Sequence, residues 1–199
     1  MVERGKGDKI FINTTGIGIV HEKANIDVDR IKNGDKIIIS GDVATHGIAI
    51  MSQRQGLAFE TDIVSDTQNL NHVIHQLLDA FGEDIHVLRD PTRGGVATVL
   101  KEIAIQSQYG MLLHDAVIPM NDSVEGACEI LGLDPLYVAN EGIFISIVEA
   151  SIADAYLKML QKMPEGNKAR CIGDVTTTPK GQVLLKSGIG GTRDRKSVV

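Results

Sequence analysis

The chain has 199 residues, of which 43% are hydrophobic and 23% are charged, as expected for one large globular domain or one domain with part of another. It has 26 acidic and 20 basic residues, giving a formal net charge of −6, and only 4% of its residues are aromatic. Without a basic cluster or a stacking surface, nucleic acid is not expected as a partner. The sequence shows no membrane-length apolar segment and no signal-peptide core, so no membrane partner is expected either.

Only two cysteines are present, Cys128 and Cys171, and they lie far apart in the sequence. A disulfide framework is therefore not expected, which favours the reducing cytoplasm as the location. Both side chains are predicted to be small members of the core.

Short apolar strands alternate with one-sided helices along the chain. Strands are predicted at residues 9–13, 36–40, 85–88, 111–113, 143–148, 169–172 and 182–185. Helices are predicted from residue 45 to about 55, from 70 to 81, over 96–104, from 122 to 131 and from 152 to 163. Ser151 and Asp154 resemble a capping box for the last of these helices. The mixture predicts helices packed on a sheet, in an α+β or α/β layered domain. Residues 22–34 are polar and without a period, which indicates a linker or extended arm and a domain boundary.

The segment 89–96 connects a predicted buried strand to a predicted helix. Thr92 is a suitable N-cap, and Gly94 and Gly95 leave the first helical turn without side chains. Free backbone N–H groups, the helix dipole and Arg93 would then converge on one point, an arrangement that holds anions such as phosphate. Asp90 adds a carboxylate for a proton or a metal. The alternative is a turn in which the glycines only permit close packing.

Asn140 and Glu141 directly precede the apolar strand at 143–148. A carboxylate at the mouth of a buried strand is well placed to act as a general base, and the alternative is a solvated glutamate on a surface turn. His46 opens a predicted helix and either contacts a ligand or bonds to the backbone. His72 and His75 have a spacing that can chelate metal, but both fall near or outside the apolar stripe, and a solvated face with no metal is expected.

Four segments together resemble the hydrogenase maturation factor HypE, of the aminoimidazole ribonucleotide synthetase and selenophosphate synthetase superfamily. They are residues 9–18, 46–49, 89–96 and 140–142, which occur in the same order and at similar spacing in that family. The resemblance runs from about Gly7 to Arg193, and the Asp-Pro-Thr-Arg-Gly-Gly and Asn-Glu-Gly motifs are fairly specific for HypE. It implies an α+β fold with helices packed on a mixed β-sheet, as in the C-terminal domain of aminoimidazole ribonucleotide synthetase.

The same resemblance implies a reaction. HypE accepts a carbamoyl group from the carbamoyltransferase HypF on its C-terminal cysteine and uses ATP to dehydrate the S-carboxamide to a thiocyanate. The thiocyanate is the source of cyanide for the iron of [NiFe] hydrogenases. The resemblance assigns Glu141, with Asn140, to proton removal. It assigns Asp90, Thr92, Arg93, Gly94 and Gly95, together with His46, to binding of phosphate or substrate.

The resemblance covers only part of a family member. A full-length HypE has an N-terminal domain with a glycine-rich, acidic site for ATP and magnesium, and a lysine that would fall just upstream of Val2. Its tail closes on Pro-Arg-Ile-Cys, whereas this chain ends at Lys196–Val199, and Cys171 lies in a predicted strand. We therefore expect a C-terminal domain that is inactive alone. ATP and Mg²⁺ belong to the full-length protein, and no ligand is expected on this fragment.

The implied organisation is a last strand and linker of the N-terminal domain at residues 1–33, the C-terminal domain at 34–192 and a tail at 193–199. The implied partners are HypF and the HypC–HypD complex, with a homodimer also possible. Two alternatives stay open at this point. One is another reaction of the superfamily, selenophosphate or aminoimidazole ribonucleotide synthesis, and the other is a non-catalytic docking module for maturation proteins.

Overall fold

The structure is a computed structural model that describes residues 14–55, 63–188 and 191–194. Over these residues seven strands form one sheet. Their spatial order is β2 (Ile85–Arg89), β4 (Ile145–Val148), β1 (Lys36–Ile39), β5 (Arg170–Thr176), β3 (Gly110–His114), β6 (Val183–Lys186) and β7 (Thr192–Asp194). Neighbouring strands are antiparallel, except that β3 and β6 are parallel. The expected mixed sheet is thereby confirmed.

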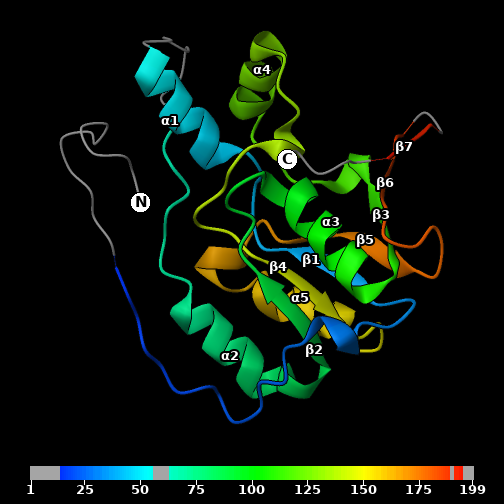
Figure 1. Ribbon diagram of the computed structural model, residues 1–199. Coiled ribbons are helices and arrows are strands. Elements are labelled where there is room, and N and C mark those ends of the chain that lie inside the picture. The colour runs from blue at the N-terminus through cyan, green and yellow to red at the C-terminus, as the bar shows by residue number, and fades with distance from the viewer. Residues whose placement is uncertain (1–13, 56–62, 189–190, 195–199) are drawn as a thin grey trace, which may run out of the picture.

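Helices cover both faces of this sheet (Figure 1). On one face α3 (Gly95–Ser107) packs on Ile37 and Ile39 of β1, and on the other face α2 (Asn71–Phe81) and α5 (Ala153–Leu160) pack around Ile38. Successive residues of a strand point to opposite faces, so the apolar run of β1 supplies both cores. This two-sided burial explains why the strand has no polar alternation.

A third, smaller core joins α1 (Thr45–Gln55) to α4 (Asp122–Leu131), and Figure 1 shows this pair beyond one end of the sheet. Cys128 is buried there, while Cys171 is half-buried at the edge of the α2 and α5 core. Burial raises the pKa of both thiols. The prediction of two core cysteines thus holds for Cys128, whereas Cys171 only packs against a core.

The predicted helices are present, but two of the predicted caps are wrong. Ser151 does not cap α5: its hydroxyl donates to the Glu149 carboxylate at 3.1 Å, and Ile152 occupies the N-cap position without a side-chain bond. Thr92 does not cap α3, because Gly94 occupies that N-cap position. At Ser151 the hydroxyl is taken by another partner, and at Thr92 the helix begins at a later residue than expected.

The polar segment before β1, residues 22–34, packs along the domain instead of extending away from it. Lys23 lies against Gly82 at the end of α2, and the Asp27 N–H donates to the His86 carbonyl at 3.0 Å. The short 3-10 helix η1 (Val28–Arg30) follows, and Ile31 is buried in the core beneath α3. The strand expected at residues 9–13 lies outside the described residues, and the three-part domain division stays a prediction. None of the helices in the described ranges is both long and apolar enough to cross a membrane.

Candidate functional site

The turn between β2 and α3 is shaped by two glycines in the left-handed region. Gly94 has a φ of 74° and Gly95 a φ of 64°. This geometry brings the Gly95 N–H to the Thr92 backbone carbonyl at 3.1 Å, so Thr92 contributes its backbone and not its side chain to the start of α3. A residue with a Cβ would be strained at either glycine position.

Close packing is a second reason for the glycines. A Cβ on Gly95 would lie 2.4 Å from the Leu136 carbonyl oxygen and 2.7 Å from that of Val138. A Cβ on Gly94 would lie 2.4 Å from the Thr98 hydroxyl. The packing alternative considered from the sequence therefore describes part of what this turn does. Anion binding by the turn stays a prediction.

Polar side chains at this turn remain open to a ligand. Asp90 and Arg93 are both exposed, and Thr92 is half-buried. The neighbouring Arg89 has a partner instead, since its guanidinium lies 3.3 Å from the Glu102 carboxylate. Of the two arginines, Arg93 is thus the one that the structure presents beside the N-terminus of α3.

Asn140 is completely buried and fastens three segments together. Its Oδ1 accepts the Ala44 N–H at 2.8 Å, and its Nδ2 donates to the carbonyls of Pro91 at 3.0 Å and Val138 at 3.1 Å. The Asn140 N–H also donates to the Pro91 carbonyl, at 3.2 Å. Asn140 therefore holds together the 89–96 turn, the start of α1 and the segment that leads into β4. We call this arrangement the Asn140 junction.

Glu141 is exposed directly beside this junction. Its backbone N–H donates to Asp66 Oδ1 at 3.2 Å, and the Gly142 carbonyl accepts from the Gln68 amide at 2.7 Å. An ideal Cβ on Gly142 would lie 1.6 Å from the Asp66 carbonyl oxygen, so only glycine allows the two segments to approach this closely. Among the described residues Asp66 Oδ2 is buried and has no hydrogen-bond partner.

His46 joins the same region through the segment that carries Asp66. Its Nδ1 lies 2.9 Å from the Ser65 hydroxyl, which is 2.8 Å from the Thr67 hydroxyl. The next residue of α1, Gly47, donates its N–H to the Ala139 carbonyl at 3.0 Å. The histidine therefore bonds to a side chain, a possibility that the sequence-based alternatives did not include.

The structure thus connects the three predicted motifs, which lie far apart in the sequence. Asn140 bonds the 89–96 turn, Glu141 bonds Asp66, and Ser65 bonds His46. Sequence reasoning missed Ser65, Asp66 and Gln68, because residues 63–69 carry no periodicity or motif. The only sequence signal was the glycine at 142, whose close contact with Asp66 could not be anticipated.

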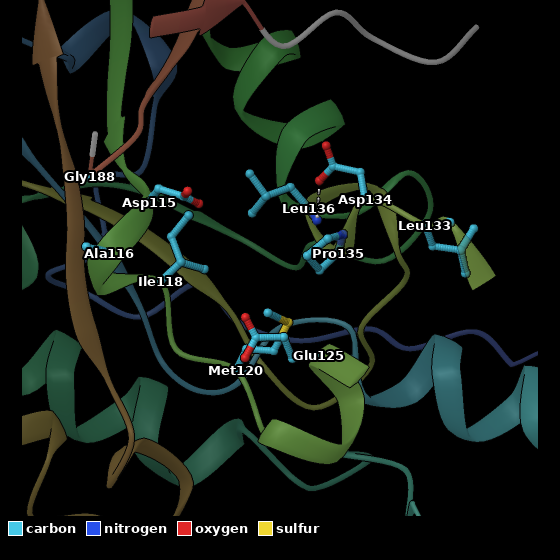
Figure 2. Close-up of a pocket in the computed structure, with 11 residues that line it drawn as sticks. Asp115, Ala116, Ile118, Met120, Glu125, Leu133, Asp134, Pro135, Leu136 and Gly188 are labelled. Atoms are coloured by element: carbon cyan, nitrogen blue, oxygen red, sulfur yellow. Dashed lines mark hydrogen bonds between the residues drawn. The ribbon is translucent and has the colours of Figure 1, made fainter. Parts of the chain in front are cut away.

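A separate cleft of about 730 Å³ is lined in part by Pro135 and Leu136 of the 3-10 helix η4 (Pro135–Tyr137) (Figure 2). Figure 2 shows carboxylates of Asp115, Glu125 and Asp134 around it, and none of the predicted site residues lines it. Because its charged lining is acidic, this cleft would repel phosphate. The candidate phosphate site therefore lies at the Asn140 junction and not in this cleft.

A smaller groove of about 470 Å³ lies beside the Asn140 junction. His46 and Gly47 form part of its wall, and the remaining lining is mainly apolar, from Ile50, Met51, Leu133, Tyr137 and Val138, with Arg54 as its cation. A groove of this kind suits an extended peptide segment better than a free phosphate.

The sequence and the fold of this chain match a known class of domain. Residues 32–186 match the family described as AIR synthase related protein, C-terminal domain, and the chain belongs to this family. The chain is 47% identical over 193 residues to the carbamoyl dehydratase HypE of Cupriavidus necator, covering 97% of this chain and 55% of that protein. The chain therefore spans about half the length of the curated relatives it matches.

Solved structures of HypE proteins share this fold. In a HypE–HypF complex the match has a TM-score of 0.85 at 39% identity, covering 89% of this chain and 57% of the other. In a HypE in complex with ATP the TM-score is 0.82 at 44% identity, covering 87% and 53%. The resemblance to HypE and the expected fold class are thereby confirmed.

Proposed function

We propose that this chain forms the substrate side of an ATP-dependent carbamoyl dehydratase that acts in hydrogenase maturation. The observation that carries the proposal is the Asn140 junction, which holds Glu141 beside the turn containing Asp90 and Arg93. The relatives named carbamoyl dehydratase support this activity over selenophosphate or aminoimidazole ribonucleotide synthesis.

The proposed reaction converts the S-carboxamide of a C-terminal cysteine to a thiocyanate, the source of the cyanide ligands of [NiFe] hydrogenases. ATP with Mg²⁺ would supply the phosphoryl group that converts the carboxamide oxygen into a leaving group. The C–O bond then breaks as phosphate departs, and the nitrogen loses both of its protons to give the C≡N bond. The balance is carboxamide and ATP to thiocyanate, ADP, phosphate and a proton.

Each site residue has a role in this scheme. Glu141 is exposed on a backbone fixed by Asp66, so its carboxylate can accept a proton from the carboxamide nitrogen. Arg93 and the positive end of the α3 dipole would stabilise the negative charge on the phosphoryl oxygens, with Asp90 and Thr92 contacting the phosphate or the incoming tail. Asn140 positions these groups, because its side-chain amide is already bonded to backbone on both sides.

The partners and location belong to the same proposal. The solved HypE–HypF complex supports HypF as a partner, from which the carbamoyl group would come. The HypC–HypD complex would receive the product. The protein would act as a homodimer, and the reaction would take place in the cytoplasm. ATP is the nucleotide bound in a solved HypE, which supports it as the co-substrate of the whole protein.

Replacing the base tests the proposal. In the full-length protein that contains this chain, Glu141→Gln is expected to lower thiocyanate formation by about 10²–10⁴-fold while ATP binding is retained. Mass spectrometry of the intact protein would follow the loss of one water from the carbamoylated tail. The matched control is Glu129→Gln, an exposed glutamate on α4, which should react like the wild type. Normal conversion by Glu141→Gln would contradict the assignment.

A further inference from the structure

A cluster of three potential ligands lies outside the candidate site, where the N-terminal arm passes α2 (Figure 1). We call His21, His75 and Asp79 the His21 cluster. The Nε2 of His21 lies 3.2 Å from Asp79 Oδ1, and the Nδ1 of His75 lies 3.0 Å from Asp79 Oδ2. One ligand atom from each residue lies within 4.8 Å of the others. Two imidazoles and one carboxylate therefore converge on one point.

The fold brings the three side chains together. His75 and Asp79 are four residues apart on α2, so both side chains lie on one face of the helix. The His21 side chain is only 14% exposed, and its ring meets the His75 ring edge to face with centroids 4.9 Å apart. His72, which the sequence paired with His75, is exposed and not part of the cluster.

The spacing suits a tetrahedral metal ion. Zn²⁺ binds histidine nitrogen and carboxylate oxygen at about 2.0–2.2 Å, which places neighbouring ligand atoms about 3.3–3.5 Å apart. The two histidines bond different oxygens of Asp79, at 3.2 and 3.0 Å, and one ligand atom from each of the three residues lies within 4.8 Å of the others, so an ion would draw the side chains together to that spacing. The nitrogen-rich ligand set favours Zn²⁺ over Mg²⁺ or Ca²⁺, which prefer all-oxygen sites.

The Asp79 carboxylate is open to a cation. Its side chain is 55% exposed, and the Lys23 ammonium bonds the Asp79 backbone carbonyl at 2.6 Å and not the carboxylate.

We propose that the His21 cluster binds one Zn²⁺-like divalent transition-metal ion, with water completing the coordination. The ion links the N-terminal arm to α2 across 58 residues of sequence. Because the arm also bonds β2 through Asp27 and His86, the ion fixes the segment that leads into the sheet. The site is independent of the proposed dehydratase residues.

Binding requires one local rearrangement. Without metal, the Lys23 N–H donates to His21 Nδ1 at 3.2 Å, which places the ring proton of a neutral His21 on Nε2, facing Asp79. A metal on Nε2 moves that proton to Nδ1 and breaks the bond from Lys23. The bond is at an exposed position, so water replaces it at little cost.

Calorimetric titration of the chelator-treated chain with zinc chloride tests the proposal. We expect one Zn²⁺ per chain, a rise in melting temperature with Zn²⁺ and no response to magnesium chloride. His75→Ala and Asp79→Ala should each weaken the affinity at least tenfold, while the matched control His72→Ala should bind like the wild type. The positions of both substitutions are exposed, and far-ultraviolet circular dichroism would verify that the variants fold.

Two results would overturn the proposal. One is the absence of Zn²⁺ binding to the folded wild-type chain. The other is binding that His21→Ala, His75→Ala and Asp79→Ala all leave unchanged, since the ion would then be held elsewhere. Neither result bears on the dehydratase proposal, because none of these residues belongs to the Asn140 junction.

Discussion

Two aspartates, the buried Asp35 and the half-buried Asp66, each have a carboxylate oxygen inside the protein and differ in how fully they are bonded. Asp35 is 2% exposed, and its Oδ2 lies 2.7 Å from His86 Nδ1 and accepts the Lys32 N–H at 2.8 Å. Asp66 accepts the Glu141 N–H with one oxygen, and within the described part of the chain its buried Oδ2 is without a partner. Buried polar groups are almost always bonded, and exceptions need an explanation. The comparison indicates that Asp35 serves the fold and that Asp66 serves the candidate site.

Breaking the Asp35–His86 pair should lower the free energy of unfolding more than the other substitutions below. His86→Ala leaves a buried carboxylate without its main partner, and we expect the free energy of unfolding to fall by about 3–5 kcal/mol. Urea denaturation of the chain would measure the loss. The control is His72→Ala on the exposed face of α2, expected to stay within about 0.5 kcal/mol of the wild type. A similar small change in His86→Ala would show that the pair does not support the fold.

Forcing the Asp66 segment away from Glu141 should have an intermediate effect. Gly142→Ala places a Cβ where the Asp66 carbonyl oxygen now lies, so the segment must shift, and we expect a loss of about 1–3 kcal/mol. The matched control is Gly126→Ala in α4, where a Cβ meets open space and helix propensity predicts a gain of up to about 1 kcal/mol. Equal melting temperatures for the two variants would contradict the close contact at Gly142.

Replacing Asp174, a partly exposed carboxylate, should change the free energy of unfolding least. It pairs with Lys36 and His114, and it is 30% exposed. Burial raises the pKa of Asp174, but the hydrogen bonds from Lys36 and His114 and their charges outweigh it, so the pKa is below its ordinary value of 3.8. The stabilisation is therefore present above that value and is lost as the pH falls through the lowered pKa.

Asp174→Asn should accordingly reduce stability by about 1 kcal/mol or less at neutral pH, because water screens a partly exposed pair. Thermal melts from pH 7 down to pH 2 would show the wild-type and variant curves converging at the acid end. A difference that grows as the pH falls would have the wrong sign and would contradict the lowered pKa.

Most of the fold could be predicted from the sequence, because burial leaves a periodic signal. Val73 and Leu77 mark the buried face of α2, and the helix at 122–131 has the bounds that were predicted. The caps at Thr92 and Ser151 were wrong, since a cap depends on the φ of a neighbour or on a competing bond, neither of which periodicity reports.

The site was only partly predictable for a related reason. The motifs around Arg93 and Glu141 were visible as a resemblance, but the contact between Asp66 and Glu141 joins residues 75 apart in the sequence. The His21 cluster likewise depends on an arm whose sequence has no period, and the helix spacing alone offered only His72 as a neighbour of His75. Contacts between an irregular segment and a regular element are the information that the sequence pattern lacks.

The most direct test of the contrast between the two aspartates is urea denaturation of Asp35→Asn and Asp66→Asn side by side. Both substitutions keep the shape of the side chain and remove its charge. We expect Asp35→Asn to lose about 1.5–3 kcal/mol, because hydrogen bonds to a charged group are lost. We expect Asp66→Asn to change by less than about 0.5 kcal/mol or to become more stable, since its unpartnered oxygen contributes nothing to folding. A loss in Asp66→Asn as large as that in Asp35→Asn would contradict the account, because both carboxylates would then serve the fold.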